Sequence, residues 1–262
     1  MTDAPTAPDR DPARVQLTDR VQWICACHDF DGRHVHVSQY VVETEGGGHV
    51  LVDAGDGHAA EMVEAVEAGT DGDGPETLML THSILPHTGN VEALRTEWDD
   101  LAVVSASNIP QLVGLPADTG TKFINSTETI AGGTFTFLDP LLTDVVATNW
   151  VYSHDAETLF TAEGVGNYHD PGECTATSRE RGEIPFDDVH DFHRDKLPFL
   201  EFVDPEKLRA GFEAVFAELD VEWIAPTHGS PIHRSDIGSY LDSVVESAGR
   251  FHYEPRTAMA DD

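Results

Sequence analysis

The sequence predicts an α/β protein in which two similar layered halves form a single domain. Short apolar runs typical of buried strands alternate with stretches of helical periodicity. Strands followed by helices occur twice along the 262 residues, with no separate linker between the two sets. A chain of this length can bury a substantial core. We therefore expect one domain over residues 15–255, preceded by a disordered tail over residues 1–14 that is acidic, polar and rich in proline.

The first half is expected to open with strands and one helix. A run of three glycines at 46–48 predicts a hairpin turn, and Met62, Val63 and Val66 share the apolar face of a predicted helix. The expected elements are strands at 21–27, 34–42, 49–52, 77–80 and 101–105, and helices at 59–68, 91–97 and 108–113.

The second half repeats this order. Strands are expected at 122–125 and 133–138, a hairpin at 148–152 and 159–162, and a last strand at 223–226. Helices are expected at 187–199, 205–219 and 237–248. Residues 164–183 are polar and lack periodicity, which predicts an irregular surface excursion.

The charge balance is strongly acidic, with 15 Lys and Arg against 48 Asp and Glu and a formal net charge of −33. The acids are dispersed, which favours a solubility adaptation to a salt-rich, halophilic cytoplasm over a surface for one basic partner. Without a basic run, nucleic-acid binding is disfavoured. No apolar stretch approaches the ~20 residues of a membrane span, and the N-terminus lacks a signal pattern. We expect a cytoplasmic protein that binds a small-molecule substrate and binds neither nucleic acid nor a membrane. Both a monomer and a homo-oligomer are compatible with the sequence.

The sequence has three cysteines, Cys25, Cys27 and Cys174, and a low, odd count argues against a disulfide framework. Cys25 and Cys27 would face the same side of a strand, which favours core packing over metal binding. Histidines 34 and 36 are expected on the surface of a strand.

A histidine loop, Thr81 to Asn90, is the centre of the functional prediction. It follows the apolar run 77–80 and precedes a predicted helix, so His82 and His87 lie at the carboxyl end of a strand. Sites in layered α/β proteins are built at that edge. The pattern suggests a metal site, against the alternative of exposed turn histidines.

Four fragments together resemble the metallo-β-lactamase superfamily, in the order of that family. They are Leu51–Gly55, the His82 to Gly89 loop, the hairpin ending at Glu163, and Ala225–Gly229. Residues 160–166, with His169 beyond them, look most like the lactamase-like domain of flavodiiron and related oxygen-binding di-iron proteins. The resemblance implies a four-layer αββα sandwich with a two-metal site at one edge.

The chain departs from the family pattern at two ligand positions. Ile84 stands where the resemblance implies a second ligand, and Pro86 stands where it implies an aspartate; neither side chain can coordinate a metal. The resemblance then suggests Asp144 as a substitute ligand beside His82, with His87 and His228 in the other half and Glu163 bridging. The metal candidates are thus His82, His87, Asp144, Glu163 and His228.

Six further residues are expected around these ligands rather than among them. Asp53 is either a turn former or a support for a ligand, and Asp56 and His58 are candidates to approach the site. Ile84, Pro86 and His169 complete the expected pocket. The sequence assigns no residue to catalysis itself.

Three functions remain open at this point. The first is a hydrolase that acts through metal-bound water, with one or two ions of Zn or Fe. The second is a di-iron protein that binds or reduces oxygen or nitric oxide. The third is a non-catalytic protein that has lost its metal, which the residues at positions 84 and 86 favour.

Overall fold

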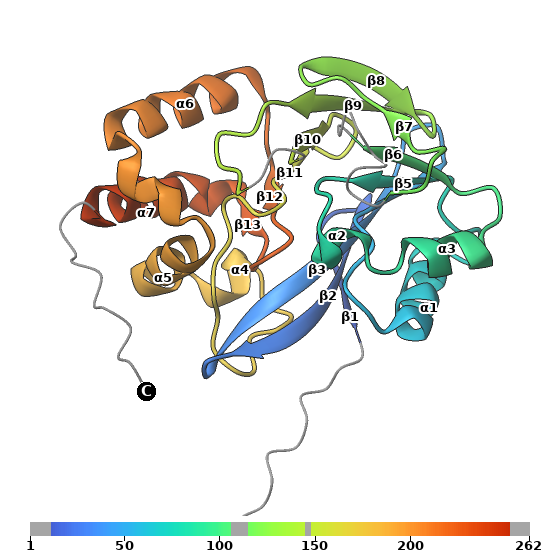
Figure 1. The fold of residues 1–262 in the computed structure, drawn as a ribbon, viewed down its shortest axis with the longest axis horizontal. Coiled ribbons are helices and arrows are strands. Elements are labelled where there is room, and N and C mark those ends of the chain that lie inside the picture. The colour runs from blue at the N-terminus through green and yellow to red at the C-terminus, as the bar shows by residue number, and fades with distance from the viewer. Residues whose placement is uncertain (1–11, 106–114, 145–147, 252–262) are drawn as a thin grey trace, which may run out of the picture.

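The structure is a computed structural model that describes residues 12–105, 115–144 and 148–251. Figure 1 shows two β-sheets between two layers of helices, the expected αββα arrangement. The predicted helix at 108–113 lies outside the described residues.

The first sheet has seven strands in sequential order. Strands β1 to β4 pair antiparallel, and β4 to β7 pair parallel. The strands are β1 (Ala13–Gln16), β2 (Val21–Phe30), β3 (Arg33–Glu43), β4 (His49–Val52), β5 (Thr77–Leu80), β6 (Ala102–Ser105) and β7 (Gly120–Thr121). Helices α1 (Ala59–Gly69), α2 (Leu85–Thr88) and α3 (Val91–Glu97) connect its parallel strands.

The second sheet has six strands in the order β13-β12-β11-β10-β9-β8. They are β8 (Ser126–Ile130), β9 (Gly133–Leu138), β10 (Trp150–Ser153), β11 (Thr158–Phe160), β12 (Trp223–Ala225) and β13 (Ile232–His233). Its helices are α4 (Ser178–Arg181), α5 (Phe186–Lys196), the 3-10 helix η2 (Pro198–Phe202), α6 (Pro205–Glu218) and α7 (Arg234–Phe251). Strands β11 and β12 pair parallel, so their carboxyl ends meet at one edge.

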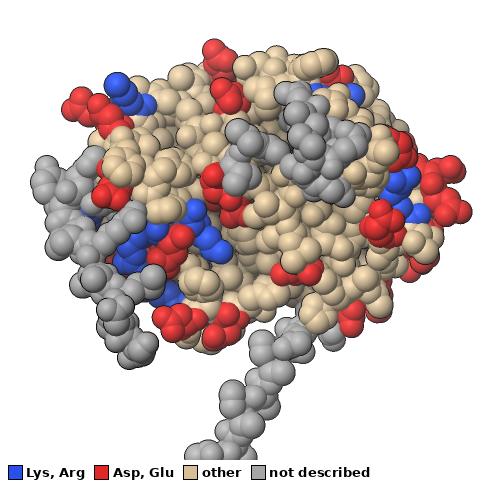
Figure 2. Space-filling view, in the orientation of Figure 1, with Lys and Arg blue, Asp and Glu red and all other residues tan. Residues whose placement is uncertain are grey.

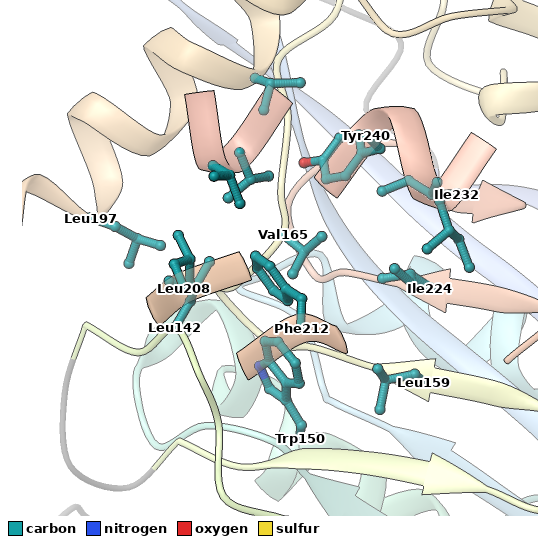
Figure 3. Close-up of a cluster of buried hydrophobic side chains, with 14 of the residues drawn as sticks. Leu142, Trp150, Leu159, Val165, Leu197, Leu208, Phe212, Ile224, Ile232 and Tyr240 are labelled. Carbon is teal, nitrogen blue, oxygen red and sulfur yellow. The ribbon is translucent and has the colours of Figure 1, made fainter. Parts of the chain in front are cut away.

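Three apolar clusters hold the four layers together. Leu51 and Leu78 of the first sheet pack with Met62 of α1. Between the sheets, side chains such as Met79 and Phe160 form the central cluster. On the outer face of the second sheet, Trp150, Leu159 and Ile224 pack with Phe212 of α6 and Tyr240 of α7 (Figure 3). Burying one such side chain contributes about 1.5–3 kcal/mol, so each sheet is stabilised on both faces.

The hairpin of β2 and β3 is the longest in the molecule as described, and it projects beyond the body of the sandwich (Figure 1). Its ten paired positions run from Val21 with Val42 to Phe30 with Arg33. The bridge between His34 and His169 joins the hairpin to the loop that follows β11. The hairpin therefore connects the two halves of the sandwich.

Several element boundaries differ from those expected. The predicted tail ended at residue 14, whereas β1 begins at Ala13, because Ala13 pairs with Cys25 of the long hairpin. The predicted strand at 122–125 is wrong: these residues connect β7 and β8. Residues 164–169 are buried and do not form the expected surface excursion. They pack against the segment that contains His228, whose carbonyl accepts the backbone N–H of Asn167.

On the face in Figure 2, acidic side chains are scattered over several elements and are not gathered in one patch. Across residues 12–105, 115–144 and 148–251, no helix has both the length and the hydrophobicity needed to cross a bilayer.

Candidate metal centre

Four strand ends converge between the two sheets. Asp53 follows β4, His82 follows β5, Glu163 lies just beyond β11, and His228 lies just beyond β12. His87 comes from the short helix α2. Since β4 pairs parallel with β5, and β11 with β12, the polar residues after these strands lie at the same edge. The sandwich thus gathers residues that are up to 175 positions apart (228 − 53).

Two histidines share one carboxylate at the centre of this edge. The Nε2 atom of His87 lies 3.2 Å from Oε1 of Glu163, and Nε2 of His228 lies 3.0 Å from the same oxygen. All three side chains are buried. Their donor atoms lie within 4.8 Å of one another, which is compact enough for one ion.

Asp53 holds the loop that carries His87. Its Oδ1 accepts the backbone N–H of Thr81 at 2.8 Å, and its Oδ2 accepts the hydroxyl groups of Thr81 at 2.7 Å and Thr227 at 3.0 Å. The same Oδ2 lies 2.8 Å from Nδ1 of His87. Asp53 has a φ of 62°, in the left-handed region that Asp tolerates better than most residues. It therefore joins the β4, β5 and β12 ends at one buried carboxylate.

His228 is oriented by the neighbouring hairpin. Its Nδ1 donates to the backbone carbonyl of His36 on β3 at 2.6 Å. With Nδ1 of His228 bonded to a carbonyl and Nδ1 of His87 bonded to Asp53, the Nε2 atom of each ring is left for a ligand. A histidine that donates its second ring N–H in this way is typical of metal ligands. The residues present therefore fit a metal ion.

The charges of the cluster are coupled. Burial alone would lower the pKa of His87, but Asp53 and Glu163 outweigh it and raise the pKa to about 9. Burial alone would raise the pKa of Glu163, but His228 and His87 hold it well below its usual range. At neutral pH the cluster thus contains a charged carboxylate able to bind a cation.

His82 and Asp144 form a second pair beside Glu163. The Nε2 atom of His82 lies 2.8 Å from Oδ1 of Asp144, and both donor atoms lie within 4.8 Å of a Glu163 oxygen. However, Nδ1 of His82 accepts backbone N–H groups from Ser83 at 2.7 Å and Ile84 at 3.3 Å. A neutral His82 must therefore carry its proton on Nε2, where it donates to Asp144. In this arrangement His82 fits a hydrogen-bonding role better than a metal-ligating one.

The segment around Glu163 is held in an unusual backbone conformation. Ala162 and Val165 have φ values of 51° and 63°, and a left-handed β-branched residue is a rare outlier. Such residues cost about 1–3 kcal/mol each and cluster at functional sites. Thr227 donates its N–H to the carbonyl of Ala162 at 3.0 Å, which joins this segment to that of His228. Gly229 is required there because an added Cβ would lie 2.5 Å from the backbone nitrogen of Asn167.

Three of the residues expected near the site do not contribute to its donor atoms. The backbone of Asp56 packs against Gly89 of the histidine loop, but its carboxylate faces His28 at 3.6 Å. His58 is exposed at the start of α1, where its left-handed backbone turns the chain into the helix. His169 is buried in a separate cluster with Cys27, His34 and Cys174. Within the described residues, none of these three belongs to the donor groups that include Glu163.

The two substituted positions of the histidine loop lie where the loop begins α2. Ile84 is the residue before the helix, and Pro86 lies in its first turn. Pro86 suits that position because the first turn needs no N–H donor. Both residues thus shape the short helix that presents His87.

Sequence reasoning missed Thr81, Thr227 and His36. The two threonines support Asp53 through hydroxyl groups, and His36 supports His228 through its backbone carbonyl. Thr81 and Thr227 each immediately precede a predicted histidine, which was an available signal. A backbone carbonyl leaves no signal in a side-chain pattern.

Comparisons with known proteins agree with this architecture. Residues 32–233 match the family model of the metallo-beta-lactamase superfamily. A search among curated proteins found no match.

Solved structures from several organisms, among them these three, are similar in fold. The rubredoxin oxygen:oxidoreductase of Desulfovibrio gigas has a TM-score of 0.73 at 18% identity, over 91% of this chain and 62% of its own. A flavoprotein of Thermotoga maritima has a TM-score of 0.72 at 18% identity, over 90% and 60%. A metallo-beta-lactamase from Pontibacter korlensis has a TM-score of 0.61 at 15% identity, over 90% and 99%. The first two are thus matched over less than two thirds of their length, and at these identities the likeness shows the fold.

Proposed function

The chain belongs to the metallo-beta-lactamase superfamily, and on this premise we propose that it is a metal-dependent hydrolase whose metal is held by His87, Glu163 and His228. The observation that supports this most is the pair of buried Nε2 atoms facing one buried carboxylate oxygen. Two imidazoles and a carboxylate with open positions suit Zn(II) or Fe(II). When bound, such an ion supplies a water whose pKa falls to about 7.

Asp144 is our candidate for the proton acceptor. Burial alone would raise its pKa, but the hydrogen bond from His82 holds the pKa below its usual value, so Asp144 is charged at neutral pH. Its side chain is 26% exposed, while that of His82 is fully buried. Asp144 is thus partly exposed to solvent and within 4.8 Å of Glu163, where it would take a proton from an attacking water. His82 would orient Asp144 and stabilise its charge.

The experiment that tests this proposal measures metal content and hydrolysis together. Protein purified in high salt without chelator or reductant should hold about one Zn or Fe per chain. His228→Ala should lose the metal and any hydrolysis of a panel of chromogenic ester, thioester and β-lactam substrates. His154→Ala is the matched control, because His154 is exposed and its imidazole hydrogen-bonds to Thr136, away from the proposed ligands. Full metal content in His228→Ala would overturn the ligand set.

A second candidate function is a di-iron centre that binds or reduces oxygen or nitric oxide. Its support is that Glu163 lies within reach of two sets of possible ligands. One set is His87 and His228, and the other is His82 and Asp144. A matched structure is itself a rubredoxin oxygen:oxidoreductase. Two iron ions per chain and a colour change on reduction would favour this candidate over the hydrolase. Purified protein that holds no metal and binds none when Zn or Fe is added would favour the non-catalytic alternative.

A further inference from the structure

A second cluster of possible metal ligands lies at the long hairpin, separate from Glu163. Cys27 of β2 and His34 of β3 lie near its tip, and His169 and Cys174 come from the loop between β11 and α4. Their donor atoms all lie within 4.8 Å of one another. His169 is fully buried, while His34 and Cys174 are partly buried, so an ion could enter from solvent. Two thiols and two imidazoles are the donor set of a closed zinc site.

Two sulfur–nitrogen distances within this cluster are close to those of tetrahedral zinc coordination. The Sγ of Cys27 lies 3.3 Å from Nε2 of His169, and the Sγ of Cys174 lies 3.5 Å from Nδ1 of His34. Zinc bonds of about 2.3 Å to sulfur and about 2.0–2.1 Å to nitrogen give tetrahedral S···N edges of about 3.5 Å. Both observed separations are close to that edge.

The backbone holds these residues together independently of any bound ion. His34 and His169 exchange two backbone hydrogen bonds, of 2.8 Å and 3.0 Å. The ring of His36 stacks on His169 with centroids 4.0 Å apart, and its Nε2 lies 2.9 Å from the carbonyl oxygen of Cys174. The ligands are therefore positioned in advance, which reduces the entropy cost of binding an ion.

In the structure the two sulfurs form a disulfide, with their Cα atoms 6.0 Å apart. This corrects the expectation that Cys25 and Cys27 both pack in the core: it holds for Cys25, which is buried and free, but not for Cys27, which is bonded to Cys174. The expected surface position of His36 is likewise wrong, because its ring is buried against that of His169, whereas His34 is partly exposed.

We propose that Cys27, His34, His169 and Cys174 bind one zinc ion when the two cysteines are reduced. Reduction by a dithiol transfers two electrons and two protons to the disulfide and leaves the reductant as a disulfide. Zinc then displaces the two thiol protons and binds both sulfurs. The ion and the disulfide are thus alternative links between the hairpin and the loop, one in each redox state.

Cobalt binding to the full chain in high salt tests this proposal. Protein stripped of metal and reduced with a phosphine should bind Co(II) and develop a thiolate-to-cobalt charge-transfer band, which zinc then removes. The metal centre at Glu163 has no sulfur donor in the described structure, so this band reports only the cysteine cluster. Reduced wild-type protein without the band would overturn the proposal, whatever the state of the other centre.

Variants assign the band to its ligands. Cys27→Ser and Cys174→Ser should abolish it, and His34→Ala, which keeps both thiols, should weaken zinc binding at least 100-fold. Cys25→Ser is the matched control and should keep the band, because the Cys25 thiol faces the carbonyls of Ala13 and Cys174. His228→Ala should also keep it. A band that persists in folded Cys27→Ser, checked by circular dichroism, would contradict the assignment.

Discussion

Oδ2 of Asp53 accepts a hydrogen bond from Nδ1 of His87 at 2.8 Å, and both side chains are buried. This contact joins the end of β4 to the loop after β5 and leaves Nε2 of His87 facing Glu163. A carboxylate behind a ligating imidazole orients the ring and raises its basicity. The geometry of the proposed centre therefore depends on a residue that would not itself touch the metal.

Asp53→Asn should lower metal affinity about 10–100-fold, as the loss of a supporting carboxylate typically does. Asparagine tolerates the left-handed backbone of this position, so the fold should persist. Competition against a chelator measures the affinity. Asp56→Asn is the control, because Asp56 contacts His28 and not the ligands. Equal affinity in the two variants would show that Asp53 has no supporting role.

The stability of the metal-free protein should fall as the pH rises from about 7 to about 9.5. The pKa of His87 is raised from its ordinary value of 6.5 to about 9 in the folded protein. The resulting stabilisation is complete below pH 6.5 and is lost as the pH passes through 9. The loss should be on the order of 2 kcal/mol, at about 1.4 kcal/mol per pKa unit.

Urea unfolding of chelator-treated protein across this pH range measures that loss. Glu163→Gln is the matched variant: it removes one of the two carboxylates that raise the pKa of His87, so its pH dependence should be shallower. A wild-type free energy of unfolding that does not change with pH would exclude a protonated His87 in the folded state.

Arg181→Met should destabilise the fold by about 3 kcal/mol, because breaking a buried ion pair leaves the partner charges uncompensated. The Arg181 side chain is 3% exposed and contacts Asp188 at 2.7 Å and Glu173 at 3.1 Å. Its Nη1 also donates to Oδ1 of Asn167 at 3.0 Å. These contacts hold the loop that carries His169 and Cys174.

Arg194→Met is the control for this loss. Arg194 is 50% exposed and pairs with Asp191 at 2.8 Å, and such surface pairs contribute at most about 1 kcal/mol. Denaturant unfolding of both variants gives the comparison. Similar small losses in the two would mean that the Arg181 network does not stabilise the loop.

The melting temperature should rise as KCl increases from about 0.1 M to about 1 M. The net charge of −33 repels itself in the compact state, and the Debye length falls from about 10 Å to about 3 Å over that range. Sucrose favours compact states without screening charge and serves as the control. If sucrose and KCl at equal osmolality raise the melting temperature equally, charge screening is not the cause.

Local patterns predicted most of the fold. Strands β5 and β12 and the β10–β11 hairpin were predictable because each strand is a short apolar run, which is the local signal of a buried strand. Boundaries were less well predicted where pairing with a distant segment extends a strand, as in β1. The burial of residues 164–169 was missed because polar residues there are satisfied by contacts with the distant segment of His228.

The sequence by itself determined which chemistry is available: histidines and acids placed directly after strands, with no donor at Ile84 or Pro86. Only the tertiary structure decided how they are used. It placed Nδ1 of His87 against Asp53, 34 residues away, and it brought Cys27 to Cys174 across 147 residues. The physical reason is that residue type sets what a side chain can donate or bind, whereas its partner depends on how distant segments pack.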